Sequence, residues 1–240
     1  MGPIMLDVES MELCAEDKEI LDHPLVGGII LFARNYHDQE QLNALTLEIR
    51  KAARHSIIIA VDHEGGRVQR FRQGFTQLPA MGNLLSMSAD QLPAAQQLAH
   101  ACGVVMAFEL LAQQIDLSFA PVLDLQGVSE VIGDRSFSPL ADEVVALSTS
   151  LMQGMKSMGM ATTGKHFPGH GSVKADSHID TPIDRRSFEQ IEATDMDIFK
   201  RVNQTGLLDA VMPAHVIYAE VDQHPAGFSR HWLQSVSYTH

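Results

Sequence analysis

Short apolar segments alternate along this chain with longer helix-like segments, and this alternation restricts the fold more than any other feature. Most of the apolar segments are rich in β-branched residues or leucine and lack a period-two alternation of polar residues. Such runs are typical of strands that are buried on both faces of a parallel sheet. They occupy residues 4–8, 27–32, 57–61, 117–122, 160–164 and 210–214.

Helices are predicted between these strands. The segments with helix-like composition and spacing are 39–54, 94–114, 142–158 and 187–205. Asp142 and Ser187 suit the N-cap position of the last two, because their side-chain oxygens can accept hydrogen bonds from free backbone amides. Strand and helix in one repeating series predict a parallel α/β fold, either an open doubly wound sheet or a (β/α)8 barrel.

Polar residues follow nearly every predicted strand, and they favour the barrel. They are Asn35, Asp62-His63-Glu64, Asp124, Lys165-His166 and His215. A (β/α)8 TIM barrel gathers functional groups from the C-terminal ends of many strands, whereas an open sheet concentrates them at one switch point. No GxGxxG or Walker-type loop follows a strand, which argues against a nucleotide-binding fold.

The number of predicted strands is six, whereas a TIM barrel needs eight. The last residues, 232–240, fall inside a predicted helix after the sixth strand, for which Ser229 is a suitable N-cap. We therefore expect residues 1–240 to form a single, incomplete TIM-barrel domain, truncated after about six β/α units. Open edges at the first and sixth strands would favour self-association of such a chain.

The composition limits the partners of the protein. Thirty acidic residues against 17 basic ones give a formal charge of -13, which repels phosphate backbones and argues against nucleic acid as a partner. Cys14 and Cys102 are too few for a disulfide framework. No basic residue precedes Lys18 and no apolar run is long enough to span a bilayer, so we expect a cytoplasmic protein without a signal peptide or a membrane partner.

The segment 165–178, KHFPGHGSVKADSH, concentrates chemically active side chains. It could form a metal site, a general acid/base loop, or a polar loop without a role. The metal site is disfavoured because the chain has no HExxH motif and no paired cysteines, and because Pro168-Gly169 would break a helix between the first two histidines. Gly169 and Gly171 would allow sharp turns in which the backbone approaches a ligand closely.

The acid/base interpretation of this segment depends on Asp176 and His178. They are two residues apart, so a turn can bring the carboxylate against the imidazole. The carboxylate would orient the ring and favour its protonated form. An unperturbed histidine titrates at about 6.5, so such a pair could both donate and accept protons near neutral pH.

The chain resembles the glycoside hydrolase family 3 β-N-acetylhexosaminidases, and within them the bacterial cytoplasmic β-N-acetylglucosaminidases that act in cell-wall recycling. The resemblance rests on KHFPGHG followed by DSH and covers essentially the whole chain. The other motifs that carry it are GGIILFARNY at 27–36, AVDHEGGRVQRF at 60–71, LSFAPVLD at 117–124, IGDRSF at 132–137 and MPAHVIY at 212–218.

This resemblance implies a retaining exo-hydrolase on a (β/α)8 barrel that removes terminal, non-reducing β-linked N-acetylglucosamine. The implied substrates are N-acetylglucosaminyl-1,6-anhydro-muramyl saccharides, with or without their peptide. No metal or organic cofactor is implied, and the complete protein is expected to be a monomer. The histidine of the DSH motif, His178, is the implied general acid/base, and Asp176 assists it. The implied substrate-binding residues are Asp62, Arg70, Arg135, Lys165 and His166.

The nucleophile of this family is an aspartate at the end of the seventh strand, in a motif resembling SDDLSM, and no such motif occurs in this chain. The covalent glycosyl-enzyme intermediate then lacks a carboxylate to form on. We therefore predict that this chain is inactive or nearly so. Two other classes stay open: a non-catalytic N-acetylglucosamine-binding protein and a His-rich metallohydrolase. With a histidine as acid/base, phosphate could also replace water as the acceptor.

Overall fold

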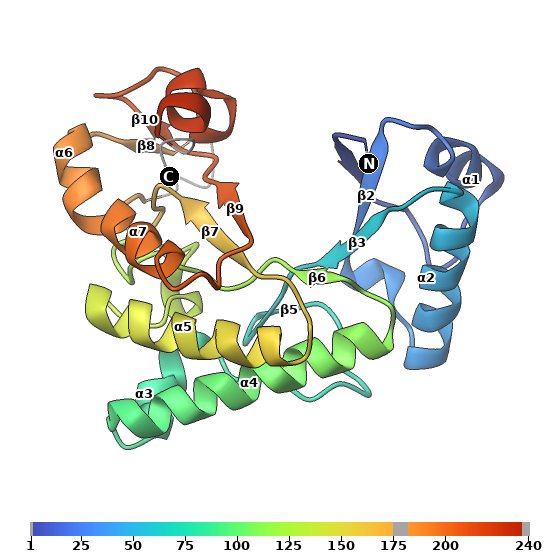
Figure 1. Cartoon of the computed structure of the whole chain (residues 1–240), viewed down its shortest axis with the longest axis horizontal. Helices are drawn as coiled ribbons and strands as arrows, with labels where there is room; N and C mark the ends of the chain where they lie inside the picture. The colour runs from blue at the N-terminus through green and yellow to red at the C-terminus, as the bar shows by residue number, and fades with distance from the viewer. Residues whose placement is uncertain (1, 175–181, 237–240) are drawn as a thin grey trace.

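The structure is a computed structural model that describes residues 2–174 and 182–236. Six parallel strands form an open barrel wall: β1 (Ile4–Leu6), β2 (Val26–Leu31), β3 (Ile58–Val61), β6 (Leu117–Ser118), β7 (Thr163–Phe167) and β9 (Ala210–Pro213). The first four form one sheet in that order, and β7 pairs with β9. Parallel bridges from Leu117 to Ala161 and from Val122 to Lys165 join the two groups. All six predicted strands and the barrel fold are confirmed (Figure 1).

The central strands and the edge strands of this wall differ in burial. Strand β2 is buried along nearly all of its length, because the barrel interior covers one face and helices cover the other. Strands β1 and β9 each pair on one side only within the described residues, and they stand apart in Figure 1. Both expose apolar side chains, with Ile4 42% and Val211 41% exposed. These two edges are the sides on which a closed barrel would continue.

Helices cover the outside of the wall. They are α1 (Ala15–Leu21), α2 (Gln39–Ala53), α4 (Leu92–Ala112), α5 (Ala141–Ser157), and a last segment that runs from α6 (Phe188–Ile191) through the π turn η4 (Glu192–Met196) into α7 (Asp197–Asn203). The four predicted helices are confirmed, and the structure adds α1, the short helix α3 (Leu84–Met87) and the π turn.

Two of the three predicted helix caps are confirmed. Ser187 Oγ accepts a hydrogen bond from the backbone N–H of Gln190, and Ser229 Oγ accepts one from the N–H of Trp232. The prediction for Asp142 is wrong, because α5 begins earlier and its N-cap residue is Leu140. Asp142 instead lies in the first turn, where a carboxylate interacts favourably with the helix dipole.

Short elements connect these strands and helices. Strands β4 (His63–Gly65) and β5 (Val68–Gln69) form an antiparallel hairpin directly after β3, and β8 (Ile183–Asp184) pairs with β10 (Ile217–Tyr218). The others are α3 (Leu84–Met87), η1 (Ala33–Asn35), η2 (Met81–Asn83), η3 (Gly133–Arg135), η5 (Ala226–Phe228) and η6 (His231–Val236).

Helix α4 is the one helix in the described part of the chain that is long and apolar enough to cross a bilayer by length and composition. Its buried residues lie at helical spacing on one side: Ala95, Ala99, Cys102, Gly103, Met106, Ala107 and Leu110. A single buried stripe of this kind is typical of a helix that packs on a protein core. Its main contact is with α5.

Helices α4 and α5 cross at very short distance because each contributes a glycine to the contact. A Cβ atom on Gly103 would lie 2.1 Å from the carbonyl oxygen of Leu151, and one on Gly154 would lie 2.2 Å from that of His100. Both obstacles are backbone atoms of a neighbouring helix, which cannot turn aside as a flexible side chain can. The close crossing therefore requires glycine at both positions.

We expect Gly103→Ala to lower the free energy of unfolding, because overpacking has a cost of about 1–3 kcal/mol in other cores. This loss should exceed the gain of about 1 kcal/mol that alanine has over glycine inside a helix. Urea denaturation followed by circular dichroism measures the change. Ala101→Ser, at an exposed position of the same helix, is the control and should change the free energy little. Unchanged or higher stability of Gly103→Ala would show that the helices separate without cost.

Candidate active site

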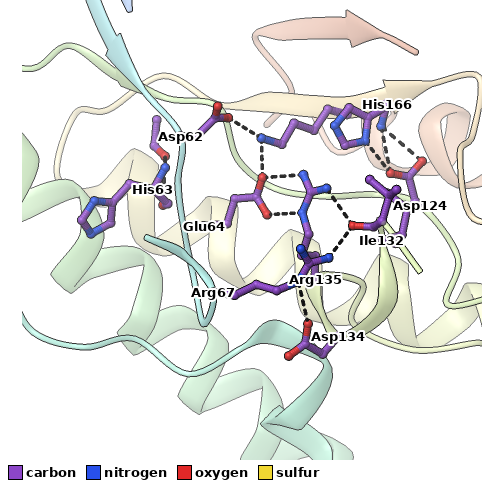
Figure 2. A network of polar contacts seen from close by, with 12 residues as sticks. Asp62, His63, Glu64, Arg67, Asp124, Ile132, Asp134, Arg135 and His166 are labelled. Carbon is purple, nitrogen blue, oxygen red and sulfur yellow. Dashed lines mark hydrogen bonds and ion pairs between the residues drawn. The ribbon is translucent and has the colours of Figure 1, made fainter. Parts of the chain in front are cut away.

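Charged residues from separate strands converge at the C-terminal rim of the barrel wall (Figure 2). Asp62 directly follows β3, and Lys165 and His166 lie in β7. Asp124 comes from the loop after β6, and Arg135 ends η3. Parallel barrel strands all end at the same rim, so residues up to 103 positions apart in the sequence meet here.

Lys165 lies at the centre of a buried ion network. Its Nζ donates to Asp62 Oδ1 at 2.8 Å and lies 2.5 Å from Glu64 Oε1. Glu64 also accepts hydrogen bonds from Nε and Nη2 of Arg135, both at 2.8 Å, in a bidentate pair. The side chains of Lys165 and Glu64 are only 1% and 4% exposed, so these partners must replace the stabilisation that water would give.

Asp62 and Arg70 form the accessible side of this network. Arg70 Nη2 lies 3.3 Å from Asp62 Oδ2, and the two side chains are 30% and 20% exposed. Burial tends to raise the pKa of Asp62, but Lys165 and Arg70 outweigh it and hold this pKa below its usual value. Burial likewise opposes ionisation of Glu64, and Arg135 and Lys165 lower its pKa. Both carboxyls are therefore ionised at neutral pH, and Asp62 can accept hydrogen bonds from a ligand.

A further buried carboxylate, Asp124, orients His166. Asp124 Oδ2 lies 2.7 Å from His166 Nδ1, and Oδ1 accepts from the backbone N–H of His170 at 2.7 Å. Burial tends to raise the pKa of Asp124, but His166 and the backbone amides of His166 and His170 lower it. Because Nδ1 of His166 faces Asp124, the other ring nitrogen, Nε2, is the one left for a ligand. The His166 side chain is 17% exposed.

The turn after β7 packs against other parts of the chain. A Cβ atom on Gly169 would lie 2.2 Å from Asp195 Oδ1, and one on Gly171 would lie 1.9 Å from the carbonyl oxygen of Leu125. Gly169 also has a φ of 148°, which favours glycine. Tyr218 OH donates to the carbonyl oxygen of Gly169 at 2.7 Å. These glycines therefore let the backbone of the turn approach neighbouring protein closely, and its approach to a ligand stays a prediction.

Five of the seven predicted site residues come together in this arrangement, namely Asp62, Arg70, Arg135, Lys165 and His166. Of these, Lys165 lies behind the two carboxylates it contacts, whereas Asp62, Arg70 and His166 are partly exposed. Asp62, Arg70 and His166 can therefore contact a ligand directly, whereas Lys165 holds the carboxylates in place. The other two predicted residues, Asp176 and His178, lie outside the described residues.

Sequence reasoning gave Glu64 and Asp124 no role, although both stood out as polar residues near strand ends. A usable signal was present, since a carboxylate that follows an apolar strand needs a cationic or N–H partner once it is buried. Asn35, which also follows a predicted strand, has a structural role instead. Its Nδ2 donates hydrogen bonds to the carbonyl oxygens of Val8 and Ser10.

His63 also stood out at a strand end, and it turns away from Glu64 (Figure 2). Its ring lies near those of Phe71 and Phe75, with centroid distances of 5.9 and 5.7 Å. It is 1% exposed, and burial lowers its pKa to about 4. The residue is therefore a neutral part of the core at pH 7.

Metal binding finds little support in the part of the chain that the structure describes. No three His, Cys, Asp or Glu side chains among residues 2–174 and 182–236 group in a way that could hold a metal ion. The rings of His166 and His170 are 5.9 Å apart, but Nδ1 of the first contacts Asp124 and Nδ1 of the second lies 3.4 Å from Ser129 Oγ. Both nitrogens thus already have protein partners.

Known proteins resemble this chain over a range that includes every residue of the ion network. The chain matches the N-terminal domain of glycosyl hydrolase family 3 over residues 4–237. It is 60% identical to a β-hexosaminidase of Tolumonas auensis and 55% identical to one of Psychromonas ingrahamii, over 98% of this chain and 70% and 69% of those proteins.

Solved structures show the same fold. NagZ from Neisseria gonorrhoeae, in complex with N-trifluoroacetyl-D-glucosamine, superposes with a TM-score of 0.92 at 48% identity, over 98% of this chain and 68% of that one. A glycoside hydrolase family 3 β-N-acetylglucosaminidase from Paenibacillus sp. has a TM-score of 0.82 at 33% identity, over 92% of this chain and 42% of that one.

The buried, neutral His63 predicts a pH dependence of stability. An unfolded histidine has a pKa of about 6.5, so as the pH falls the unfolded state binds a proton before the folded state does. The stabilisation from this residue is fully present above about pH 6.5 and is lost as the pH falls toward its folded pKa of about 4. The loss should reach about 3 kcal/mol.

Urea titrations at about pH 7 and about pH 5 measure this loss. His63→Phe should flatten the decline in the free energy of unfolding, because it removes the group that titrates. His37→Phe is the control, since the side chain of His37 is 73% exposed, and it should keep the wild-type slope. An equal slope in His63→Phe and the wild type would contradict a buried neutral imidazole.

Proposed function

The chain belongs to glycosyl hydrolase family 3, and from this premise we propose that it provides the sugar-binding site of an exo-acting β-N-acetylglucosaminidase. Such an enzyme removes a terminal non-reducing N-acetylglucosamine with retention of configuration. The motifs of the chain support this activity, as do the relatives named β-hexosaminidase and β-N-acetylglucosaminidase.

The arrangement at the barrel rim is the observation that carries this proposal. A sugar presents neighbouring hydroxyl groups that both donate and accept hydrogen bonds, so its site needs fixed partners of both kinds. Asp62 offers an acceptor, Arg70 carries donors and His166 offers a ring nitrogen, while Arg135 lies beside them with its guanidinium paired to Glu64. Ion pairs hold these groups in place before a ligand arrives, which lowers the cost of ordering them on binding.

The proposed sugar is an N-acylated glucosamine. NagZ from N. gonorrhoeae, 48% identical to this chain, has been solved in complex with N-trifluoroacetyl-D-glucosamine, which is a sugar of this kind. We propose N-acetylglucosaminyl-1,6-anhydro-muramyl saccharides, with or without peptide, as the natural substrates. A cytoplasmic role in cell-wall recycling goes with this substrate, and both rest on the resemblance of the sequence motifs.

Proton transfer is assigned to His178, assisted by Asp176. In this assignment, the imidazolium donates a proton to the glycosidic oxygen as the bond to the anomeric carbon breaks and a nucleophilic carboxylate bonds to that carbon. The imidazole later takes a proton from the water that displaces this carboxylate. The carboxylate orients the ring and favours its charged form. The assignment rests on the DSH motif, since both residues lie outside the described ranges.

Sugar binding without turnover is the second candidate function, for residues 1–240 by themselves. These residues contain no motif like SDDLSM, so the covalent intermediate needs a carboxylate from elsewhere. The ion network, in contrast, is assembled entirely from described residues of this chain. That contrast favours binding over catalysis for this stretch of sequence.

Purified residues 1–240 should hydrolyse an aryl N-acetyl-β-glucosaminide on the order of 10³-fold more slowly, or worse, than a full-length relative, because removal of a nucleophile has at least this effect in other hydrolases. The β-hexosaminidase of T. auensis, at equal concentration, is the reference for the release of the aryl group. Turnover comparable to the reference would contradict the assignment and would point to another carboxylate as nucleophile.

N-acetylglucosamine should nevertheless bind to residues 1–240, and Asp62→Asn should weaken this binding by about tenfold or more because it removes a charged acceptor. Isothermal titration calorimetry measures both affinities. Asp142→Asn is the matched control, since the side chain of Asp142 is 88% exposed on α5, and it should bind like the wild type. Equal binding by Asp62→Asn would exclude Asp62 from the sugar site.

A further inference from the structure

The carboxylate of Asp124 is held in the site by a single turn of the chain. It is fully buried, and its partners among the described residues are the ring of His166 and the backbone N–H groups of His166 and His170. The direction in which these N–H groups point therefore decides where the carboxylate lies. Because the carboxylate contacts Nδ1 of His166, it also decides how the imidazole ring is oriented.

The N–H of His170 belongs to the same peptide unit as the carbonyl of Gly169. This unit is planar and trans, so its N–H and its carbonyl oxygen point in opposite directions. The N–H donates to Asp124 Oδ1 at 2.7 Å, and the carbonyl oxygen accepts a hydrogen bond from Tyr218 OH, also at 2.7 Å. The carboxylate and the tyrosine thus fix one peptide plane from opposite sides. A hydrogen bond at the carbonyl also polarises the amide and strengthens its N–H as a donor.

Tyr218 is well suited to act as a fixed donor. It lies in β10 opposite Asp184 of β8, it is 0% exposed, and its ring centroid is 5.1 Å from that of Trp232. Burial and three nearby carboxylates raise the pKa of Tyr218 well above its usual value. The hydroxyl therefore keeps its proton at neutral pH and can donate to Gly169.

The turn is also supported by Asp195, which lies in the π turn η4. A Cβ atom on Gly169 would lie 2.2 Å from Asp195 Oδ1, so the two residues are in close contact. Asp195 Oδ2 accepts from Arg186 Nη1 at 2.6 Å, and Nη2 of the same guanidinium donates to Asp184 Oδ2 at 2.6 Å. Since β8 pairs with β10, a continuous series of buried contacts joins Asp195 to Tyr218. Gly169 is therefore held at its Cα as well as at its carbonyl.

We propose that Tyr218 is a positioning residue of the sugar site: its hydroxyl holds the Gly169–His170 peptide, so that Asp124 keeps His166 with Nε2 toward the ligand. The part of this inference that concerns sugar rests on the function proposed above. Without the hydroxyl, the peptide is free to rotate, and Asp124 loses the shortest of its hydrogen bonds from backbone amides. The His166 ring can then present either nitrogen to the site.

Tyr218→Phe tests this role, because it removes the hydroxyl and keeps the ring. In the wild type, the neutral form of His166 should carry its proton on Nδ1, which faces Asp124. In Tyr218→Phe, part of the population should carry it on Nε2. The ¹⁵N resonances of the ring distinguish the two forms at about pH 9, well above the ordinary imidazole pKa of about 6.5. His166→Gln identifies these resonances by their loss.

The affinity for N-acetylglucosamine is the second measurement. Calorimetry on residues 1–240 should show binding weakened by about threefold or more in Tyr218→Phe, because removal of one hydrogen bond has an effect of this size. Tyr36→Phe is the matched control, since Tyr36 OH also donates to a backbone carbonyl oxygen, that of Gln73, and its ring packs near Phe71. This control should keep the wild-type proton distribution and the wild-type affinity.

A wild-type proton distribution on His166 in Tyr218→Phe, shown to be folded by circular dichroism, would overturn the inference. The same shift in Tyr36→Phe would do so too, because it would reflect a general loosening of the fold. A shifted distribution with unchanged affinity would also count against it, since His166 would then not face the sugar.

Hydrogen exchange in the wild type decides the matter if Tyr218→Phe does not fold. The backbone amide of His170 should exchange slowly, because it is hydrogen-bonded to a buried carboxylate. Rapid exchange of this amide would contradict a fixed peptide plane. A wild type that does not bind N-acetylglucosamine would remove the proposed function, whereas the measurements on His166 and His170 need no sugar. The two failures are therefore distinguishable.

Discussion

The burial of Lys165 is the constraint on which the rest of the site depends. An ammonium group whose side chain is 1% exposed is stable only beside carboxylates, so Asp62 and Glu64 must lie where β7 ends. Those carboxylates then hold Arg70 and Arg135 through their remaining oxygens. One buried cation thus fixes the positions of four other charges, and buried ion pairs determine the geometry of the accessible face of the site.

The barrel supplies the geometry that this constraint requires. Parallel strands bring their C-terminal ends to one rim, and the loops after them carry side chains that reach across it. Asp124 illustrates how closely backbone and side chains are linked there, because it accepts from the backbone amides of His166 and His170 and also orients the His166 ring. The same carboxylate therefore shapes the turn after β7 and presents a ring nitrogen to a ligand.

The fold was predictable because a strand buried on both faces carries its signal within a few consecutive residues. The cap of α5 was not, since Asp142 has the right chemistry but the loop before it enters the helix at Leu140, and no local pattern records that path. The network was predictable in part: Lys165 lies in a motif, whereas the roles of Glu64 and Asp124 come from partners 71 and 42 positions away. Long-range pairs of this kind leave no periodic trace in the sequence.

The length of chain between paired charges also determines when the site can form. Lys165 and Asp62 are separated by 103 positions, and Glu64 and Arg135 by 71. Closing such long loops is entropically costly, so we expect the network to form after the strands in between have paired. A collapsed intermediate can already have its helices while the rim is still unassembled. Retention on an immobilised sugar would therefore select molecules that have completed folding, a distinction that helical content alone does not make.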